Sequence, residues 1–306
     1  MSPAPLVIVI GNCTVDLSFA VPRFPKAGET LLARERRVDL GGKGANQAMV
    51  SHRFGVETLL AAPIGRDAEG HWACAQLAAE GLSPAGIQRT DTATDQSIIY
   101  VTPDGENSIV SSHQAAAQAT PEWAEAAIAA VPVGAYLLMQ GNLSLATTCA
   151  ALAAGRARGL PTMINPAPIQ YAYDQIFPLT DIAVLNAVEA VELGRRGDPI
   201  GAGQAIREAG VPTVIVTLGA QGAVLIGGGA PIRFPAPRVA AVDTVGAGDV
   251  FCGALVACLA RGIVLATALE VAIDAAALAV TRRGTQASFP TTAEATAILH
   301  HHEVPR

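Results

Sequence analysis

Short runs of aliphatic and β-branched residues alternate with alanine-rich stretches along most of the 306-residue chain. This alternation constrains the fold most strongly, because strands separated by helices pair in parallel and need helices on both faces of the sheet. Strands are expected at residues 6–10, 58–62, 135–140, 161–165, 182–186 and 213–219, and helices at 69–79, 121–130 and 145–158. The pattern predicts a three-layer α/β fold with a mostly parallel central sheet covered by helices.

The most apolar region of the sequence, from Val250 to Val280, is the one to consider as a membrane span. Three charged residues interrupt it, namely Arg261, Glu270 and Asp274. These interruptions are too frequent for a membrane span of about 20 apolar residues. The region is therefore predicted to form two buried helices.

Two segments break the alternation, at about residues 13–40 and 95–112. The second contains Asp104-Gly105-Glu106 between two alternating runs, which is a hairpin signal. Both segments are predicted to form a small β-sheet lid over one edge of the main sheet. No repeat or low-complexity linker divides the sequence, so we expect one domain over residues 1–306.

Parallel sheets of this class bind ligands at the carboxyl ends of their strands. Polar residues and a glycine follow the ends of the expected strands: Asn12, Asn142, Asn165, Asn186 and Gly219. The sequence therefore predicts a ligand-binding edge lined by amides.

Composition limits the partners and the compartment. The net charge is −6 and no run of Lys and Arg is longer than a pair, which argues against binding to nucleic acid or an anionic membrane. The five cysteines are scattered without a CxxC pair, so neither a disulfide framework nor a zinc site is expected from them. The apolar run at residues 6–10 is too short for a signal peptide. A reducing cytoplasm is the expected location.

The segment GGKGANQA, residues 41–48, places one of only two lysines among three glycines. It lacks the spacing and the hydroxyl of a Walker loop, and it does not directly follow the first strand as a dinucleotide fingerprint would. From the residues alone, a tight turn before a helix is an equal alternative to a ligand-binding loop.

A second glycine loop, VDTVGAGDVFCGA, occupies residues 242–254. It places Gly246, Ala247 and Gly248 at the start of an apolar helix, with Asp249 in the first turn. Free N–H groups at a helix start bind anions, whereas Asp249 by itself could be a simple helix cap. An anion site beside a carboxylate is what phosphoryl transfer to an alcohol requires.

Five motifs in order carry a family resemblance: GGKGANQA, NPAP (165–168), NAVE (186–189), TLGAQG (217–222) and DTVGAGD (243–249). Together they resemble the ribokinase branch of the PfkB family of carbohydrate kinases, over nearly the whole chain. The GGKGAN form is nearer to ribokinases than the GGAPAN form of fructokinases. The resemblance implies a ribokinase-like fold and transfer of the γ-phosphate of ATP to the primary hydroxyl of a pentose, with ribose expected first. It also implies Mg²⁺ and a monovalent cation, K⁺, as cofactors.

The resemblance assigns roles by position. Asp249 would be the general base, and the amides of Gly246, Ala247 and Gly248 would form the anion hole. Asp249 would also contact the sugar, together with Asp16, Gly42, Lys43, Asn46 and Asn142. ATP would contact Asn186, Thr217, Gly219, Gly222, Gly248 and Ile273, and Glu189 would act indirectly on Mg²⁺. The monovalent cation would lie among Asp243, Val245, Ala279, Arg282, Gly284 and Ser288.

Departures from the family pattern concern the substrate more than the reaction. Asn142 stands where ribokinases have a glutamate that touches the sugar, and Ile273 where the family often has Asn or His near adenine. The stretch at 113–118 also replaces a loop richer in glycine and asparagine. A kinase for deoxyribose or a fructose-type sugar thus remains an alternative to a ribose kinase.

Two further alternatives differ in function. A nucleoside kinase of the same superfamily would need a base pocket in the lid, where Phe19, Phe24 and Tyr100 are the only nearby aromatics. A non-catalytic sugar or nucleotide sensor would not need Asp249. The alternating faces of the lid strands, Ile98 with Tyr100 and Ile99 with Val101, predict a homodimer formed through the lid.

Two sets of reactive side chains are expected to be inert. The histidines at 300–302 show no metal-binding spacing with acidic residues and are predicted to be a solvated helix end. Cys252 is predicted to pack as a small apolar residue on the helix that carries Asp249.

Overall fold

The computed structural model describes residues 6–104 and 106–302. Its main sheet has nine strands. In sheet order they are β13 (Ile232–Phe234), β12 (Ala223–Ile226), β11 (Thr213–Thr217), β10 (Ile182–Asn186), β9 (Thr162–Asn165), β8 (Tyr136–Gln140), β1 (Leu6–Ile10), β4 (Glu57–Gly65) and β5 (Ile87–Thr90). Neighbouring strands from β11 to β5 pair in parallel, whereas β12 and β13 are antiparallel. The predicted mostly parallel sheet is confirmed.

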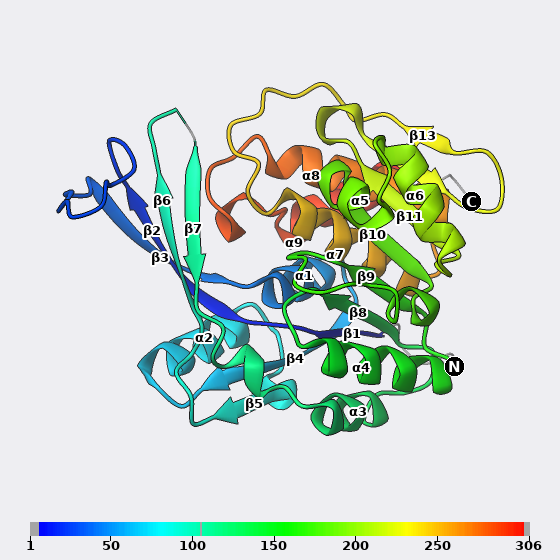
Figure 1. Cartoon of the computed structure of the whole chain (residues 1–306), viewed down its shortest axis with the longest axis horizontal. Helices are drawn as coiled ribbons and strands as arrows, with labels where there is room; N and C mark the ends of the chain where they lie inside the picture. Colours follow the sequence, from blue (N-terminus) through cyan, green and yellow to red (C-terminus); the bar gives the residue numbers. More distant parts are fainter. Residues whose placement is uncertain (1–5, 105, 303–306) are drawn as a thin grey trace.

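Helices cover both faces of this sheet, because its central strands are apolar on both sides. Val7 and Val9 of β1 pack into one hydrophobic cluster, and Ile8 and Ile10 into the other. The first cluster includes residues of α1 (Lys43–Arg53), α2 (Ala68–Ala79), α7 (Ala247–Ala260), α8 (Leu265–Ala279) and α9 (Thr292–His302). The second includes residues of α3 (Pro121–Ala129), α4 (Leu145–Ala157), α5 (Ala187–Gly194) and α6 (Pro199–Glu208). The three-layer architecture follows from this arrangement (Figure 1).

Most helices begin at a side chain that caps them. Asp67, Thr120, Ser144 and Asp198 each accept a hydrogen bond from a backbone N–H in the first turn of their helix. Short 3₁₀ turns lie at Pro84–Gly86, Ala116–Gln118, Phe177–Leu179, Gly219–Gln221 and Gln286–Ser288. The strand predicted at 213–219 is β11, which ends earlier, at Thr217, because the turn at Gly219–Gln221 follows it.

The small sheet contains β3 (Glu35–Gly41), β2 (Thr14–Ala20), β6 (Gln96–Val101) and β7 (Asn107–Ser111), in that order. It projects from one end of the molecule (Figure 1). The antiparallel pairing of β6 with β7 confirms the predicted hairpin, although Gly105 of its turn lies outside the described residues.

The register of the small sheet separates its side chains into two faces. One face carries Asp16, Ser18 and Ala20 of β2 and borders a cavity of about 560 Å³. The other carries a row of directly paired apolar residues, Val38, Leu17, Ile98 and Val110. Three of these four are exposed, with only Leu17 partly covered. The inner face therefore brings Asp16 to the cavity, whereas the outer face carries this apolar row.

No helix in the described part of the chain is both long and apolar enough to cross a membrane.

Candidate active site

The GGKGANQA segment forms the end of β3 and the first turns of α1. Gly42 precedes α1 with φ of 89°, a conformation that favours glycine. A Cβ at Gly41 would lie 2.2 Å from the carboxylate of Asp16, and one at Gly44 would lie 2.6 Å from the carbonyl oxygen of Asn12. The glycines thus allow the start of α1 to approach the residues beyond β1 and within β2.

Helix α1 packs closely against α7, which brings polar residues of both helices together. A Cβ at Gly253 of α7 would lie 2.7 Å from the carbonyl oxygen of Gln47. Asn46 and Gln47 of α1 and Asp249 of α7 are all buried, and Asp249 is 5% exposed. Three polar side chains therefore share the dry contact between two helices, although about 200 residues separate the two segments.

Asp249 is held by two hydrogen bonds and one ion pair from α1. Asn46 Nδ2 donates to Oδ2 over 3.0 Å, and Gln47 Nε2 donates to Oδ1 over 3.0 Å. Lys43 Nζ lies 3.7 Å from Oδ1. The charge of Asp249 is the main cause that raises the pKa of Lys43, and the charge of Glu189 adds to it. Hydrogen bonds and an ion pair thus satisfy the oxygens of this buried carboxylate.

Further amides fix the orientation of these donors. Gln140 Nε2 donates to Gln47 Oε1 over 2.8 Å, and Gln286 Nε2 donates to Asn46 Oδ1 over 3.1 Å. Because both amide oxygens are occupied, the amide nitrogens of Asn46 and Gln47 point to Asp249. Gln47 Nε2 also lies 3.2 Å from Asn165 Oδ1.

The resemblance did not assign a role to Gln47, Gln140 or Gln286. Gln47 directly follows Asn46 in the GGKGANQA motif, and this adjacency was the available signal. Gln140 and Gln286 come from distant segments of the chain. They do not bond to Asp249 themselves but to Gln47 and Asn46, which do.

The backbone N–H groups at the start of α7, where the anion hole is predicted, differ in whether they are already bonded. Gly246 caps the helix with φ of 79°, and a Cβ there would lie 2.7 Å from the ring of Phe289. The N–H of Ala247 donates to the Thr244 carbonyl over 3.3 Å, so it is already engaged. The first backbone hydrogen bond of the helix runs from the N–H of Val250 to the carbonyl of Gly246. The N–H groups of Gly248 and Asp249, which precede it, therefore have no acceptor within the helix. A Cβ at Gly248 would meet no atom within 4 Å, so the space beside it is open.

Asp16 lies on the inner face of the small sheet, at the cavity of about 560 Å³. It is 8% exposed and accepts a hydrogen bond from the Thr14 hydroxyl over 2.8 Å. Burial raises the pKa of Asp16, and the charges of Asp39 and Asp249 add to this effect. The cavity also borders the loops at 241–245 and 283–287, so it lies between the small sheet and the main body.

Asn142 makes no hydrogen bond with the other predicted sugar contacts in the described chain. Its side-chain oxygen is buried without a partner among the described residues, and its backbone carbonyl lies 2.7 Å from His113 Nε2. The fold thus places in contact two segments that depart from the family's sequence pattern, namely 113–118 and the residue at 142.

The NAVE motif forms a complete capping box at the start of α5. Asn186 Oδ1 accepts from the N–H of Glu189 over 2.9 Å, and Glu189 Oε2 accepts from the N–H of Asn186 over 2.9 Å. Asn186 Nδ2 also donates to Glu189 Oε1. Asn186 is exposed and Glu189 is half-buried, and these bonds hold their oxygens at the carboxyl end of β10.

The predicted ATP contacts in TLGAQG surround a tight turn after β11. Gly219 and Gly222 have φ of 57° and 87°, and a Cβ at Gly222 would lie 1.9 Å from the Phe234 carbonyl oxygen. Thr217 ends β11 at the same edge of the sheet as Asn186. Ile273 of α8 is 6% exposed in the core, so protein already covers most of it.

Two loops meet at the residues predicted to hold a monovalent cation. The carboxylate of Asp243 accepts hydrogen bonds from the N–H groups of Val245 and Gly284, both over 3.0 Å. Arg282 instead directs its side chain to Glu294, and the Ser288 hydroxyl donates to the Thr285 carbonyl. Ala279 is buried at the end of α8. The structure therefore brings Asp243, Val245 and Gly284 into direct contact.

Cys252, one turn after Asp249, is buried, and burial raises its pKa well above the ordinary value. The thiol is therefore uncharged at neutral pH, as the apolar packing role requires.

Known proteins resemble this chain over nearly its whole length. Residues 4–292 match the model of the pfkB family carbohydrate kinases. A ribokinase from Mus musculus is 34% identical over 298 residues, which cover 94% of this chain and 92% of the relative.

Solved structures agree with this match. A ribokinase from Thermotoga maritima superposes with a TM-score of 0.87 at 30% identity, covering 97% of this chain and 99% of its own. An Arabidopsis thaliana ribokinase complexed with ribose and ATP gives 0.85 at 26% identity, covering 97% and 98%. With the family model matched over most of the sequence, the chain belongs to the pfkB family of carbohydrate kinases.

Proposed function

We propose that this protein transfers the γ-phosphate of ATP to the primary hydroxyl of a pentose, with ribose as the substrate. The observation that carries the proposal is the buried Asp249, which two amides and an ammonium group hold beside the open start of α7. The similarity to ribokinases, one of them complexed with ribose and ATP, supports a pentose.

Asp249 acts as the general base. Its carboxylate accepts the proton of the sugar hydroxyl as the oxygen attacks phosphorus. Asn46 and Gln47 fix its orientation through hydrogen bonds, and the ammonium group of Lys43 lies beside the same carboxylate. The Gly248 N–H and the positive end of α7 stabilise the charge that develops on the transferred phosphoryl group.

The site also suits the two cations that the family resemblance implies. Asn186 and Glu189 offer oxygens at the same sheet edge and would hold hydrated Mg²⁺, which neutralises phosphate charge. Carbonyl and hydroxyl oxygens suit K⁺, and the loops tied together through Asp243 supply them. The residues proposed to surround K⁺ are Asp243, Val245, Ala279, Arg282, Gly284 and Ser288.

The chain is proposed to work as one cytoplasmic kinase domain, with the small sheet as its lid. The inner face of this sheet places Asp16 beside a cavity that the loops at 241–245 and 283–287 close from the other side. Sugar bound between Asp16, Gly42, Lys43, Asn46 and Asn142 would be shielded from water while its hydroxyl faces Asp249. Thr217, Gly219, Gly222 and Ile273 would border ATP.

Asp16→Asn is expected to raise stability at pH 7 while weakening sugar binding. A carboxyl whose pKa is raised on folding binds its proton more tightly in the folded state, so its ionisation destabilises the fold at neutral pH. The gain in thermal midpoint should shrink as the pH falls through the raised pKa, because wild-type Asp16 then becomes neutral. Lost charged hydrogen bonds should raise the sugar KM roughly tenfold to a hundredfold.

Thermal midpoints at pH 7 and pH 5, with sugar KM values, check this expectation. Asp91→Asn is the matched control, because it makes the same replacement at a side chain that is 96% exposed; its midpoints and sugar KM should equal those of the wild type. A lower midpoint at pH 7 for Asp16→Asn, or an unchanged sugar KM, would contradict the proposed role of Asp16.

We also propose a homodimer formed through the outer face of the lid. The paired apolar row Val38, Leu17, Ile98 and Val110 runs across all four strands, and all of its members except Leu17 are exposed, which is typical of an interface. Light scattering should give twice the chain mass of 31.2 kDa.

Ile98→Asp should convert this dimer to a monomer, because it places a charge in the middle of the row. Val133→Asp, an equal change at an exposed valine after α3, should leave the mass unchanged. A monomeric wild-type protein, or a dimer insensitive to Ile98→Asp, would remove the proposed interface.

ADP release from MgATP in the presence of K⁺ tests the substrate. The panel contains ribose, deoxyribose, fructose, other pentoses and several nucleosides. We expect ribose to give the highest kcat/KM. A preference for deoxyribose or fructose would assign another sugar to the Asn142 pocket, and a preference for a nucleoside would make the lid a base-binding surface. ATP binding without turnover on any substrate would favour a sensor.

A further inference from the structure

The end of α9 lies against α8 and brings histidines to acidic side chains. The expectation of a solvated helix end was wrong for His302, whose side chain is 16% exposed. His302 Nε2 lies 2.8 Å from Asp274 Oδ2, and its Nδ1 lies 3.8 Å from Glu270 Oε2. Asp274 and Glu270 are one helical turn apart on α8, so a single imidazole lies between two carboxylates.

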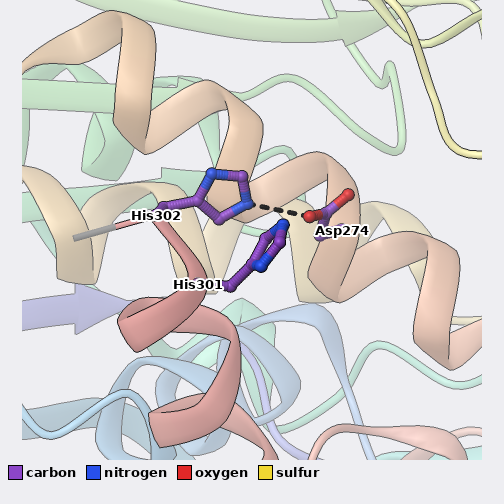
Figure 2. A group of neighbouring side chains, drawn as sticks. All are labelled: Asp274, His301 and His302. Atoms are coloured by element: carbon purple, nitrogen blue, oxygen red, sulfur yellow. Dashed lines mark hydrogen bonds and ion pairs between the residues drawn. The ribbon is translucent and has the colours of Figure 1, made fainter. Parts of the chain in front are cut away.

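His301 completes the cluster. Figure 2 shows its ring beside that of His302, with Asp274 facing both. The two ring centroids are 5.1 Å apart and the rings are nearly perpendicular, at 82°. One ligand atom from each of Asp274, His301 and His302 lies within 4.8 Å of the other two.

This spacing fits a first-row transition ion. Zn²⁺ binds His nitrogen and carboxylate oxygen at about 2.0–2.2 Å, which keeps tetrahedral ligand atoms about 3.5 Å apart. Small side-chain rotations would bring all three ligand atoms to such distances, and His301 is exposed and can adjust. Two imidazoles and a carboxylate suit Zn²⁺ better than the hard ions Mg²⁺ or K⁺.

Glu270 adds a second feature of histidine metal sites. A ligating imidazole usually donates its other N–H to a carboxylate, which fixes the ring and strengthens it as a ligand. With His302 Nε2 on the metal, its Nδ1 faces Glu270. The two carboxylates of α8 therefore take different roles, one as ligand and one as orienting partner.

We propose that Asp274, His301 and His302 form a divalent transition-metal site of the Zn²⁺ class, with water in the remaining position. The site joins the last turn of α9 to α8. Helix α8 leads directly into the loop whose Gly284 bonds Asp243 and whose Gln286 bonds Asn46. A bound ion would therefore stabilise the helix pair that supports one side of the active site, without contacting the substrates.

Zn²⁺ binding by the full-length, untagged protein tests this site. After treatment with a chelator, equilibrium dialysis against Zn²⁺ with excess Mg²⁺ should show one Zn²⁺ per chain. At a free Zn²⁺ concentration 100 times the dissociation constant, the thermal midpoint should rise by about 5 °C. Asp274→Asn and His302→Ala should each weaken binding at least tenfold and, at the same free Zn²⁺ concentration, lower the rise by at least about half.

His71→Ala is the matched control, because His71 lies on α2 and its Nδ1 contacts the Asp67 carbonyl at the start of the same helix. It should retain both the stoichiometry and the rise in midpoint. Absence of stoichiometric Zn²⁺ in the wild type overturns the proposal. So does Zn²⁺ binding that Asp274→Asn and His302→Ala leave unchanged. Asp274→Asn keeps the side-chain shape, so the test does not depend on a destabilising truncation.

Discussion

Asp249→Asn should lower kcat by about 10²–10⁴, the range for loss of a general base, while the sugar still binds. The asparagine keeps the size of the side chain but cannot accept the hydroxyl proton. It also places an NH₂ group against one of two donors, Asn46 Nδ2 or Gln47 Nε2, whose oxygens are already occupied by other amides. Steady-state kinetics with ribose and MgATP, together with sugar binding measured by calorimetry, check both parts.

Asp91→Asn provides the matched control for this change. It makes the same replacement at a side chain that is 96% exposed and pairs with Arg66 at the surface. Its kcat should equal that of the wild type. An Asp249→Asn enzyme with near-normal turnover would refute the assignment of Asp249 as the base.

Gly248→Ala should abolish most activity without loss of stability. A Cβ there meets no protein atom within 4 Å, and alanine is favoured over glycine inside a helix by about 1 kcal/mol. The added methyl group would occupy the open space where the phosphoryl oxygens are proposed to lie. Loss of one such donor site costs about 10²–10³ in kcat, and we expect a decrease of that size.

Gly246→Ala is the comparison that separates ligand exclusion from misfolding. At Gly246 the backbone has φ of 79° and a Cβ would lie 2.7 Å from Phe289, so this change should lower the thermal midpoint. Gly248→Ala should keep or raise it. A Gly248→Ala enzyme with wild-type kinetics would show that phosphate does not bind at the start of α7.

Local sequence patterns predicted the sheet well, because apolar runs of strand length depend little on distant residues. The strands at 6–10 and 182–186 have the predicted bounds, and the expected helices start or end within a residue of the observed ones. The strand expected to reach residue 219 was too long, since Gly219 and Gly222 turn the chain with positive φ. The edge strands β5 and β13 have few residues and weak patterns.

The site was only partly predictable, because its central contacts join segments about 200 residues apart. Asn46 and Asp249 were each assigned by motif, but their mutual hydrogen bond depends on how α1 packs on α7. Gln140 and Gln286 orient Gln47 and Asn46 rather than contacting Asp249, and no motif in the sequence around them indicates this role. The pairing of His302 with Asp274 likewise depends on the contact between α8 and α9, so spacing along the chain could not reveal it.

The position of the phosphate on the product tests the central proposal most directly. Phosphorus NMR of ribose incubated with the protein, MgATP and KCl should show one new sugar phosphate, coupled to the protons of the primary carbon and formed in equal amount with ADP. A phosphate on any other hydroxyl, or ADP formed without a sugar phosphate, would contradict transfer to a primary hydroxyl held at Asp249.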